Sequence, residues 1–471
     1  MKRLTTMSLS VAFAAMLIFC FAISAQAQMT HTGTLSDGAT YLIEVPANWN
    51  GTLFLYSHGY VVPGTPNPAQ DAGDPVTRAF LLASGYALAG SSYATTGWAI
   101  HEALPDQIAV LDQFTRLLGH PQRTIAWGHS LGGMVTAALI QRYPDRFDAA
   151  LPMCGVLSGG VGTWNAGLDG AFAFKTLVAT NSPVQVVNIA NPLANLGLAE
   201  QLLAVAQQSP QGRARIALGA ALDDVPGWFT PLSPEPTAGD STAQEANQFL
   251  WESQVDFPFG FAFRAELEAR AGGNVSSNTR VDYRKQFALS ADRNEVIALY
   301  KAAGLDLDAD LDTLNDAPRI SADPEALRYL KQNIIYDGEI RVPVLTMHTT
   351  GDGLVEVENE QAYRDVVDEA GNQRLLRQTF VHRAGHCAFT PAETVAAVKN
   401  LITRLDSGKW PNLDDEGLNA EAESLGPALN IFAVQGQVIP TSPAFVDFHP
   451  KQFLRPFDAL DHGFEFFSDR R

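Results

Sequence analysis

Strand-like and helix-like segments alternate along the first third of the chain, and this alternation restricts the fold more than any other feature. The strand-like segments are short apolar runs at 40–46, 51–60, 86–93, 124–130 and 147–154. The helix-like segments lie at 76–84, 106–118 and 131–142. Such alternation predicts an α/β fold with a mostly parallel sheet and helices on both of its faces.

The alternation stops after the fifth strand-like run and resumes near residue 340. Strand-like runs return at 340–349 and 375–383, and a helix-like segment follows at 392–405. A mainly helical insertion between two core strands predicts a cap at the carboxyl ends of the strands, where such sheets bind ligands. We therefore expect a core formed by 28–157 and 336–406, a cap at 158–335, and a tail at 407–471 of unknown structure.

The N-terminus has the pattern of a secretory signal. Basic residues at 2–3 precede an apolar stretch over about 9–23, and Ala25 and Ala27 then form a small-x-small cleavage pattern. An uncleaved anchor is the alternative, but the apolar stretch is short for a membrane span. We expect cleavage after Ala27 to remove 1–27, so that the mature chain is exported to a periplasmic or extracellular compartment and has no membrane span.

The charge balance restricts the partners. The chain has 51 acidic and 32 basic residues, which gives a formal net charge of −19. A surface of this sign repels phosphate backbones and anionic lipids, so we expect neither nucleic acid nor peripheral membrane binding. A small-molecule or oligomeric substrate is the expected partner, and the sequence leaves the oligomeric state open.

The stretch GHSLGG matches the pattern G-x-S-x-G through Gly128, Ser130 and Gly132. It lies between a strand-like run and a helix-like one, where small flanking residues allow the backbones to approach around a strained central serine. The pattern alone is weak, but this context favours Ser130 as a nucleophile. A serine hydroxyl needs a histidine base and an acid to orient that base.

Two further residues follow in the required order. Asp352 comes after a strand-like run in MHTTGDGLVEVE, and His386 comes after the last run in HRAGHCAF. The order Ser130, Asp352, His386 resembles that of the α/β-hydrolase superfamily, over about 40–157 and 340–405. The resemblance implies the α/β-hydrolase fold with a large helical cap, and a Ser-His-Asp triad.

Two of the three triad positions, the histidine and the acid, have rivals. His382 is only four residues from His386, but it belongs to the strand rather than to the turn after it. Glu356 and Glu358 are alternatives to Asp352, which fits the turn of the family better.

The resemblance also implies an oxyanion hole, because acyl transfer needs two positioned N–H donors. The backbone N–H of Leu131, just after the nucleophile, is one expected donor. The N–H of Tyr60 is the other, in the sequence SHGY that ends the strand-like run 51–60. Gly59 allows close approach of the substrate.

Two cysteines remain after removal of the signal, Cys154 and Cys387. In an oxidising compartment they form either one disulfide or two separate buried thiols. Because Cys387 directly follows His386, a disulfide to Cys154 would hold the histidine loop in place.

No metal or cofactor is expected. The stretch LDLDADLDTLND has aspartates at a calcium-like spacing over 305–316, but Leu311 and Ala317 stand where a calcium loop needs Gly and Glu. A solvated acidic turn is the better interpretation.

These observations predict an exported serine hydrolase that cleaves a carboxylic ester. A secreted peptidase or aminopeptidase-like amide hydrolase is the first alternative, and an acyltransferase is the second. A hydrolase-like binding protein is the alternative outside enzymes. Aromatic residues are frequent in the cap, where they either form its own core or receive an apolar substrate.

Overall fold

A computed structural model describes residues 28–434 and 436–455, so the expected signal peptide lies outside the described residues. The main sheet has the strand order β1-β2-β4-β3-β5-β6-β7-β8-β11. Its strands are β1 (Met29–Thr34), β2 (Thr40–Val45), β3 (Thr52–Ser57), β4 (Ala87–Ser91), β5 (Arg123–His129), β6 (Ala149–Met153), β7 (Val344–Gly351), β8 (Leu376–Ala384) and β11 (Phe445–Val446). All pairs from β4 to β8 are parallel, whereas β1, β2 and β11 are antiparallel to their neighbours. The predicted fold class is confirmed.

Successive residues of the central strands point to opposite faces, and each face has its own hydrophobic core. In β3, Leu53 and Leu55 belong to one core, whereas Phe54 and Tyr56 belong to the other. The first core is covered by α2 (Ile100–Leu118), α3 (Leu131–Arg142) and α13 (Asn359–Glu369). The second is covered by α1 (Pro75–Ala83), α14 (Pro391–Ser407) and α15 (Asp415–Ser424). Helices on both faces explain why the central strands are continuous apolar runs.

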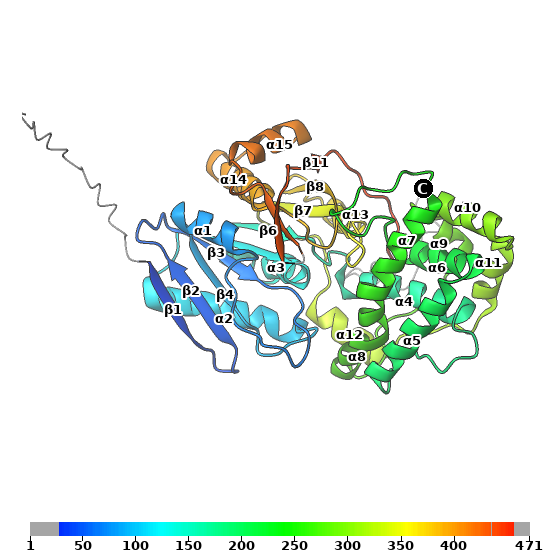
Figure 1. Cartoon of the computed structure of the whole chain (residues 1–471). Coiled ribbons are helices and arrows are strands. Elements are labelled where there is room, and N and C mark those ends of the chain that lie inside the picture. Colours follow the sequence, from blue (N-terminus) through cyan, green and yellow to red (C-terminus); the bar gives the residue numbers. More distant parts are fainter. Residues whose placement is uncertain (1–27, 435, 456–471) are drawn as a thin grey trace, which may run out of the picture.

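The segment between β6 and β7 forms a body of helices beside the sheet, on the right in Figure 1. Its helices are α4 (Gly159–Leu177), α5 (Pro192–Ala206), α6 (Pro210–Asp223), α7 (Ser241–Trp251), α8 (Arg264–Ala271), α9 (Tyr283–Leu289), α10 (Arg293–Ala303), α11 (Leu307–Asp316) and α12 (Pro324–Asn333). π-Helical turns at Glu252–Asp256 and Phe259–Phe263 connect α7 to α8. The cap has hydrophobic clusters of its own, which include Phe172, Leu218 and Phe261.

The structure corrects the interpretation of the acidic stretch and adds structure to the tail. The expected acidic turn is wrong, because Leu307–Asp316 forms the helix α11 with Asp306 as its N-cap. Arg284 pairs with Asp308 and Asp312, and the aspartates therefore sit in ion pairs on a helix. In the tail, α15 packs on α14, β9 (Ile431–Val434) pairs with β10 (Gln437–Pro440), and β11 extends the main sheet.

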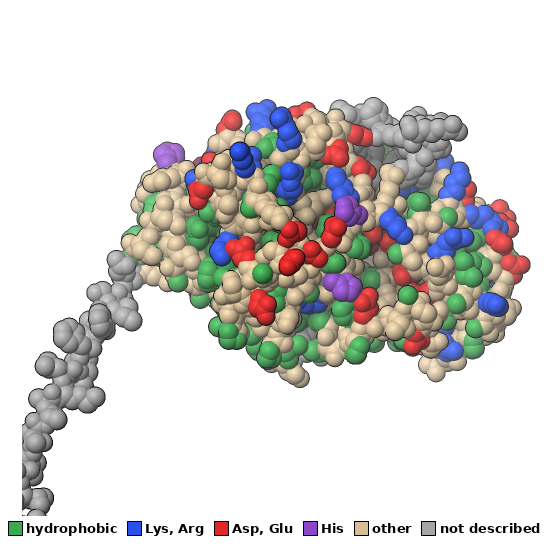
Figure 2. Space-filling view, turned by 90° about the horizontal axis from the view of Figure 1, so that it is seen from above, with side chains coloured by type: hydrophobic (Ala, Val, Ile, Leu, Met, Phe, Trp, Pro, Cys, Tyr) green, Lys and Arg blue, Asp and Glu red, His purple; other side chains and the backbone are tan. Residues whose placement is uncertain are grey.

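The described surface has no strong segregation of charge on the face in Figure 2, where acidic and basic side chains are interspersed. Within 28–434 and 436–455, no helix combines the length and the apolar composition that crossing a bilayer requires. The same residues hold no cluster of three or more His, Cys, Asp or Glu side chains suited to a metal ion.

Candidate active site

Ser130 occupies the sharp turn between β5 and α3. Its φ is 59°, a left-handed conformation that is rare for a residue with a side chain. A Cβ at Gly132 would lie 1.9 Å from the carbonyl oxygen of Ser57, and one at Gly128 would lie 2.5 Å from the same atom. Both glycines are therefore required by the close approach of this turn to the end of β3, as the sequence predicted.

Asp352 and His386 follow β7 and β8, and the structure brings them together. The Nδ1–H of His386 donates to Asp352 Oδ2 over 2.7 Å, and the backbone N–H groups of Leu354 and Val355 donate to Oδ1 over 3.1 Å. Burial raises the pKa of Asp352, but the charge on His386 and the contacts with His348 hold it well below its ordinary value. Asp352 is therefore a fixed carboxylate that orients the imidazole of His386.

A disulfide between Cys154 and Cys387 connects the end of β6 to the loop that carries His386. Of the two alternatives left open by the sequence, the structure therefore shows the bonded one. Both cysteines have positive φ, 42° for Cys154 and 54° for Cys387. The bridge holds this loop against the sheet in a backbone conformation that non-glycine residues avoid.

Arg383 supports the same loop from β8. Its buried guanidinium binds both carboxylate oxygens of Glu393, over 2.7 and 2.9 Å, and it donates to the carbonyl oxygen of Ala388 over 2.7 Å. Glu393 also completes a capping box with Thr390 at the start of α14. The histidine loop is thus held at a disulfide and at a buried ion pair.

Ser130 and His386 line one cavity of about 340 Å³. In this structure no hydrogen bond joins the two described side chains, and His386 Nε2 lies 3.4 Å from the sulfur of Cys387. Hydrogen bonds between catalytic groups are often loose in a resting enzyme and tighten when substrate binds. The geometry therefore joins Asp352 to His386 and places Ser130 on the wall of the same cavity.

Aromatic side chains form much of the cavity wall. The core contributes Tyr60 and Trp98, and the cap contributes Trp164, Phe257 and Phe259. The rings of Tyr60 and Phe259 lie 5.2 Å apart, so the cap and the core meet at the cavity. Phe257 also belongs to the core of the cap, so this ring both packs within the cap and lines the cavity.

Four carboxyl groups line the cavity as well: Asp223, Glu252, Asp256 and Glu356. Burial raises the pKa of Asp223 to about 7 and that of Glu252 to about 8, and their negative neighbours add to the effect. Burial also raises the pKa of Asp256 and Glu356 well above the ordinary range. These groups come from α6, from a π-helical turn and from the loop after β7. No sequence motif indicates the three groups of the cap, and Glu356 was considered only as an alternative to Asp352.

The two residues expected to supply the oxyanion donors, Leu131 and Tyr60, line the same cavity as Ser130. Leu131 is the first residue of α3, so its N–H is one of the unpaired donors at a helix N-terminus. Tyr60 lines the cavity, and a Cβ at Gly59 would lie 3.3 Å from Ser130 Cβ. Burial raises the pKa of the Tyr60 phenol, which therefore stays protonated.

The rival residues have other partners. His382 is exposed and binds Glu235 over 2.9 Å and Thr350 over 3.0 Å. Glu356 accepts from Asn359, and Glu358 lines a different cavity. None of the three is hydrogen-bonded to His386, although all of these residues are described.

A second histidine at the site, His348, lies fully buried in β7 beside Asp352. Its only mark in the sequence is a position four residues before Asp352, a spacing too common to predict a contact. The strand-to-turn geometry that brings the two side chains together is a property of the folded chain.

The chain is similar to several known proteins. The o-phthalyl amidase of Xanthobacter agilis is 33% identical to the chain over 444 residues, which is 87% of this chain and 94% of that protein. Residues 93–159 match the model of the prolyl oligopeptidase family. Among solved structures, an esterase from Aspergillus oryzae covers 88% of this chain and 84% of its own, with 16% identity and a TM-score of 0.43. An acylaminoacyl peptidase from Pyrococcus horikoshii covers 78% of this chain and 38% of its own, with 8% identity and a TM-score of 0.33.

Proposed function

The chain belongs to the serine hydrolases of the α/β-hydrolase superfamily, and from this premise we propose that it cleaves the amide bond of an aromatic carboxylic acid through an acyl-enzyme on Ser130. The observation that carries the proposal is the hydrogen bond from His386 to Asp352 beside an aromatic cavity that Ser130 lines. Asp352 fixes the tautomer in which Nε2 of His386 is free to accept a proton.

The proposed reaction has two halves. Nε2 of His386 takes the hydroxyl proton as Ser130 Oγ attacks the carbonyl carbon, and the N–H groups of Leu131 and Tyr60 stabilise the oxyanion. His386 then gives the proton to the departing nitrogen, because an unprotonated amine is a poor leaving group. A water molecule, deprotonated by the same imidazole, attacks the carbonyl carbon of the acyl-enzyme. The bond to Ser130 Oγ then breaks, Oγ takes the proton back from His386, and the acid is released.

The choice between amide and ester rests on the relative, whose name is that of an amidase. The sequence alone favoured a carboxylic ester, and the same groups serve an ester because its alcohol leaves more readily. We therefore propose that an aromatic amide is the substrate and that activated aryl esters are cleaved as well. Aromatic acyl groups fit a cavity whose walls include Trp98, Trp164 and Phe257.

We further propose that the chain is exported, with cleavage after Ala27. The disulfide supports this proposal, because disulfides persist in oxidising compartments.

The test uses the mature protein and four chromogenic substrates. They are 2-carboxybenzoyl p-nitroanilide, benzoyl p-nitroanilide, alanine p-nitroanilide and p-nitrophenyl benzoate, each with the wild type and with Ser130→Ala. We expect the wild type to release p-nitroaniline from both benzoyl anilides and p-nitrophenol from the ester, and we expect Ser130→Ala to lose all three activities. Activity on the ester alone would favour an esterase, and activity on the aminoacyl anilide alone would favour an aminopeptidase. Full activity of Ser130→Ala would overturn the mechanism.

A further inference from the structure

The buried histidine His348 lies between two carboxylates. Its Nε2 is 2.8 Å from the carbonyl oxygen of Val355 and 3.6 Å from Asp352 Oδ2, and its Nδ1 is 3.4 Å from Glu360 Oε1. The side chains of His348, Asp352 and Glu360 are all buried. The Asp352 oxygen that faces His348 is the one that accepts the hydrogen bond from His386.

Both ring nitrogens of His348 face oxygen atoms that accept hydrogen bonds. A carbonyl oxygen cannot donate, and an ionised carboxylate cannot donate either. A neutral imidazole has one unprotonated nitrogen. Here that nitrogen would face another hydrogen-bond acceptor, with no proton to share between them. The arrangement is satisfied when both nitrogens carry protons, that is, when His348 is an imidazolium ion.

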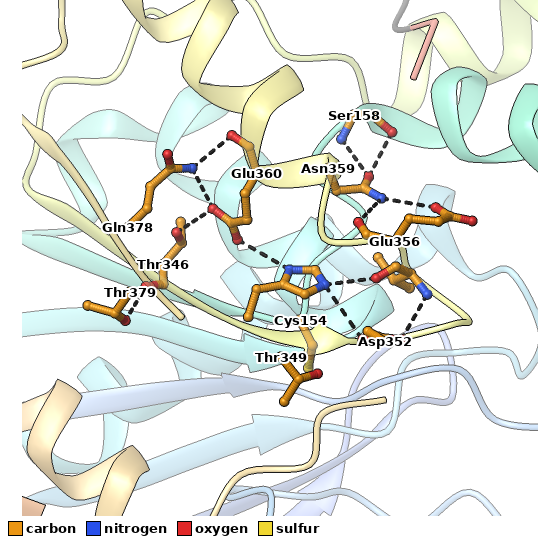
Figure 3. Close-up of polar contacts among 12 residues, drawn as sticks. Cys154, Ser158, Thr346, Thr349, Asp352, Glu356, Asn359, Glu360, Gln378 and Thr379 are labelled. Atoms are coloured by element: carbon orange, nitrogen blue, oxygen red, sulfur yellow. Dashed lines mark hydrogen bonds and ion pairs between the residues drawn. The ribbon is translucent and has the colours of Figure 1, made fainter. Parts of the chain in front are cut away.

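Each of the two carboxyl groups accepts further hydrogen bonds. Glu360 accepts from the hydroxyl of Thr346 and from the amide of Gln378, and Figure 3 shows both side chains directed at its carboxylate. Asp352 accepts from two backbone N–H groups and from His386. Two stabilised anions on either side of one ring favour its positive charge.

His348 also holds the turn that carries Asp352. The backbone N–H of Val355 donates to Asp352 Oδ1, while the carbonyl oxygen of Val355 accepts from His348. The ring therefore contacts the carboxylate and the backbone that fixes the carboxylate's other oxygen. Loss of the ring would release both constraints at once.

We propose that His348 is a positioning residue whose permanent positive charge fixes the Asp352 turn and lowers the pH at which His386 takes up its proton. This inference rests on the proposed function, because it assigns His386 as the base. Through the shared Oδ2 atom, the cation offsets part of the negative charge that Asp352 exerts on His386. His386 then stays neutral, and able to accept a proton, to a lower pH.

The surroundings of His348 agree with a permanent charge. Burial opposes protonation, but the contacts with Asp352 and Glu360 outweigh it and raise the pKa of His348 to about 10. A third carboxyl group, Glu358, also interacts with the ring, and burial raises its own pKa well above the ordinary range.

The first experiment measures the charge directly in the wild type. Histidine-selective ¹⁵N labelling reports the protonation of both ring nitrogens of each of the ten histidines of the full chain between pH 5 and 9. We expect one buried histidine to remain doubly protonated at pH 9, with its signal missing in His348→Gln. If all histidines lose a proton below pH 8, the proposal is wrong. This readout does not depend on catalysis, so it separates the charge of His348 from the proposed function.

The second experiment measures the pH dependence of inactivation by a fluorophosphonate, which follows the deprotonation of the base without a known substrate. In His348→Gln the acid limb of the inactivation profile should move up by about one pH unit. The reason is that a unit charge beside the Asp352 oxygen that His386 also contacts has an effect of that order. In Glu360→Gln the glutamine carbonyl oxygen can still accept from the ring, so the limb should stay in place or move down.

His382→Gln is the matched control, because that histidine lies on the neighbouring strand and contacts neither Asp352 nor Glu360. Its profile should equal that of the wild type. Shifts of the limb in the same direction in His348→Gln and Glu360→Gln would indicate loosened packing and would overturn the proposal. A wild type that is not labelled at all would refute the proposed function, whereas the NMR result would still decide the charge of His348.

Discussion

The disulfide between Cys154 and Cys387 offers a quantitative test of how the histidine loop is held. It joins residues 233 positions apart, and the whole cap lies within the loop that it closes. The perturbation is the double variant Cys154→Ser/Cys387→Ser, compared with the oxidised wild type. The variant should fold, because the two core clusters of the sheet are otherwise intact.

Two opposing effects set the expected change in stability. Closing a loop of this length stabilises the folded chain by about 5 kcal/mol in the chain-entropy model. Against this, Cys154 and Cys387 both have positive φ, and each such residue costs on the order of 1 kcal/mol that the variant can release. We therefore expect a net loss of about 2–4 kcal/mol in the free energy of unfolding.

The activity of the variant should fall even under conditions in which the variant is fully folded. His386 is adjacent to Cys387, and a displacement of about 1 Å in a catalytic group can lower the rate about 100-fold. The assay is urea unfolding of both proteins, together with kcat/KM on p-nitrophenyl benzoate in the absence of urea. Equal unfolding midpoints and equal kcat/KM in wild type and variant would refute the role of the bridge.

Four further substitutions test the site and its surroundings. Gly132→Ala should lower the free energy of unfolding by at least about 3 kcal/mol, because its Cβ would meet the Ser57 carbonyl at 1.9 Å. Gly167→Ala, a helical glycine with no atom within 4 Å of the new Cβ, should be neutral or stabilising; equal urea midpoints for the two variants would contradict the account. Asp352→Asn should lower kcat about 10³–10⁴-fold on the aryl ester, and a loss below tenfold would argue against its role. Finally, the pKa of Glu252 is about 8 in the folded chain, above its unfolded value, so the folded chain binds more protons between about pH 4 and 8 and its stability falls as pH rises through that window. Glu252→Gln should flatten the slope of the free energy of unfolding against pH. An unchanged slope would exclude a contribution from Glu252.

The central strands and the nucleophile turn could be predicted because their determinants are local. Strands buried on both faces read as apolar runs, and Gly128, Ser130 and Gly132 form one contiguous motif in the sequence. The contact that requires the two glycines, with the carbonyl of Ser57 at the end of β3, is visible only in the structure. Helix α2 was predicted only over 106–118, from its apolar spacing. In the structure the helix continues through Pro105 back to Ile100.

The edges of the sheet could not be predicted in the same way. β1 has the sequence MTHTGT with mostly exposed or half-exposed side chains, and it is held by backbone pairing to β2. β11 is two residues long and joins the sheet through β8. Neither segment has the apolar periodicity on which strand prediction depends.

The grouping of the cavity carboxyl groups, and the contacts of His348, could not be predicted from the sequence for a different reason. Asp223 and Glu356 are more than 130 residues apart and share a wall only because the cap folds against the core. Glu360 meets His348 because α13 packs against the sheet beside β8, the neighbour of β7. Tertiary packing decides which side chains these groups contact, and a single sequence contains no local signal for such packing.

The most direct test of the account is the identity of the nucleophile. The wild type is treated with a fluorophosphonate, digested with trypsin, and searched by mass spectrometry for modified serines, in parallel with Ser130→Ala. The account predicts a single adduct in the peptide that follows Arg123 and ends at Arg142, on Ser130, and no adduct in the variant. An unmodified wild type, or labelling that persists in Ser130→Ala, would contradict it.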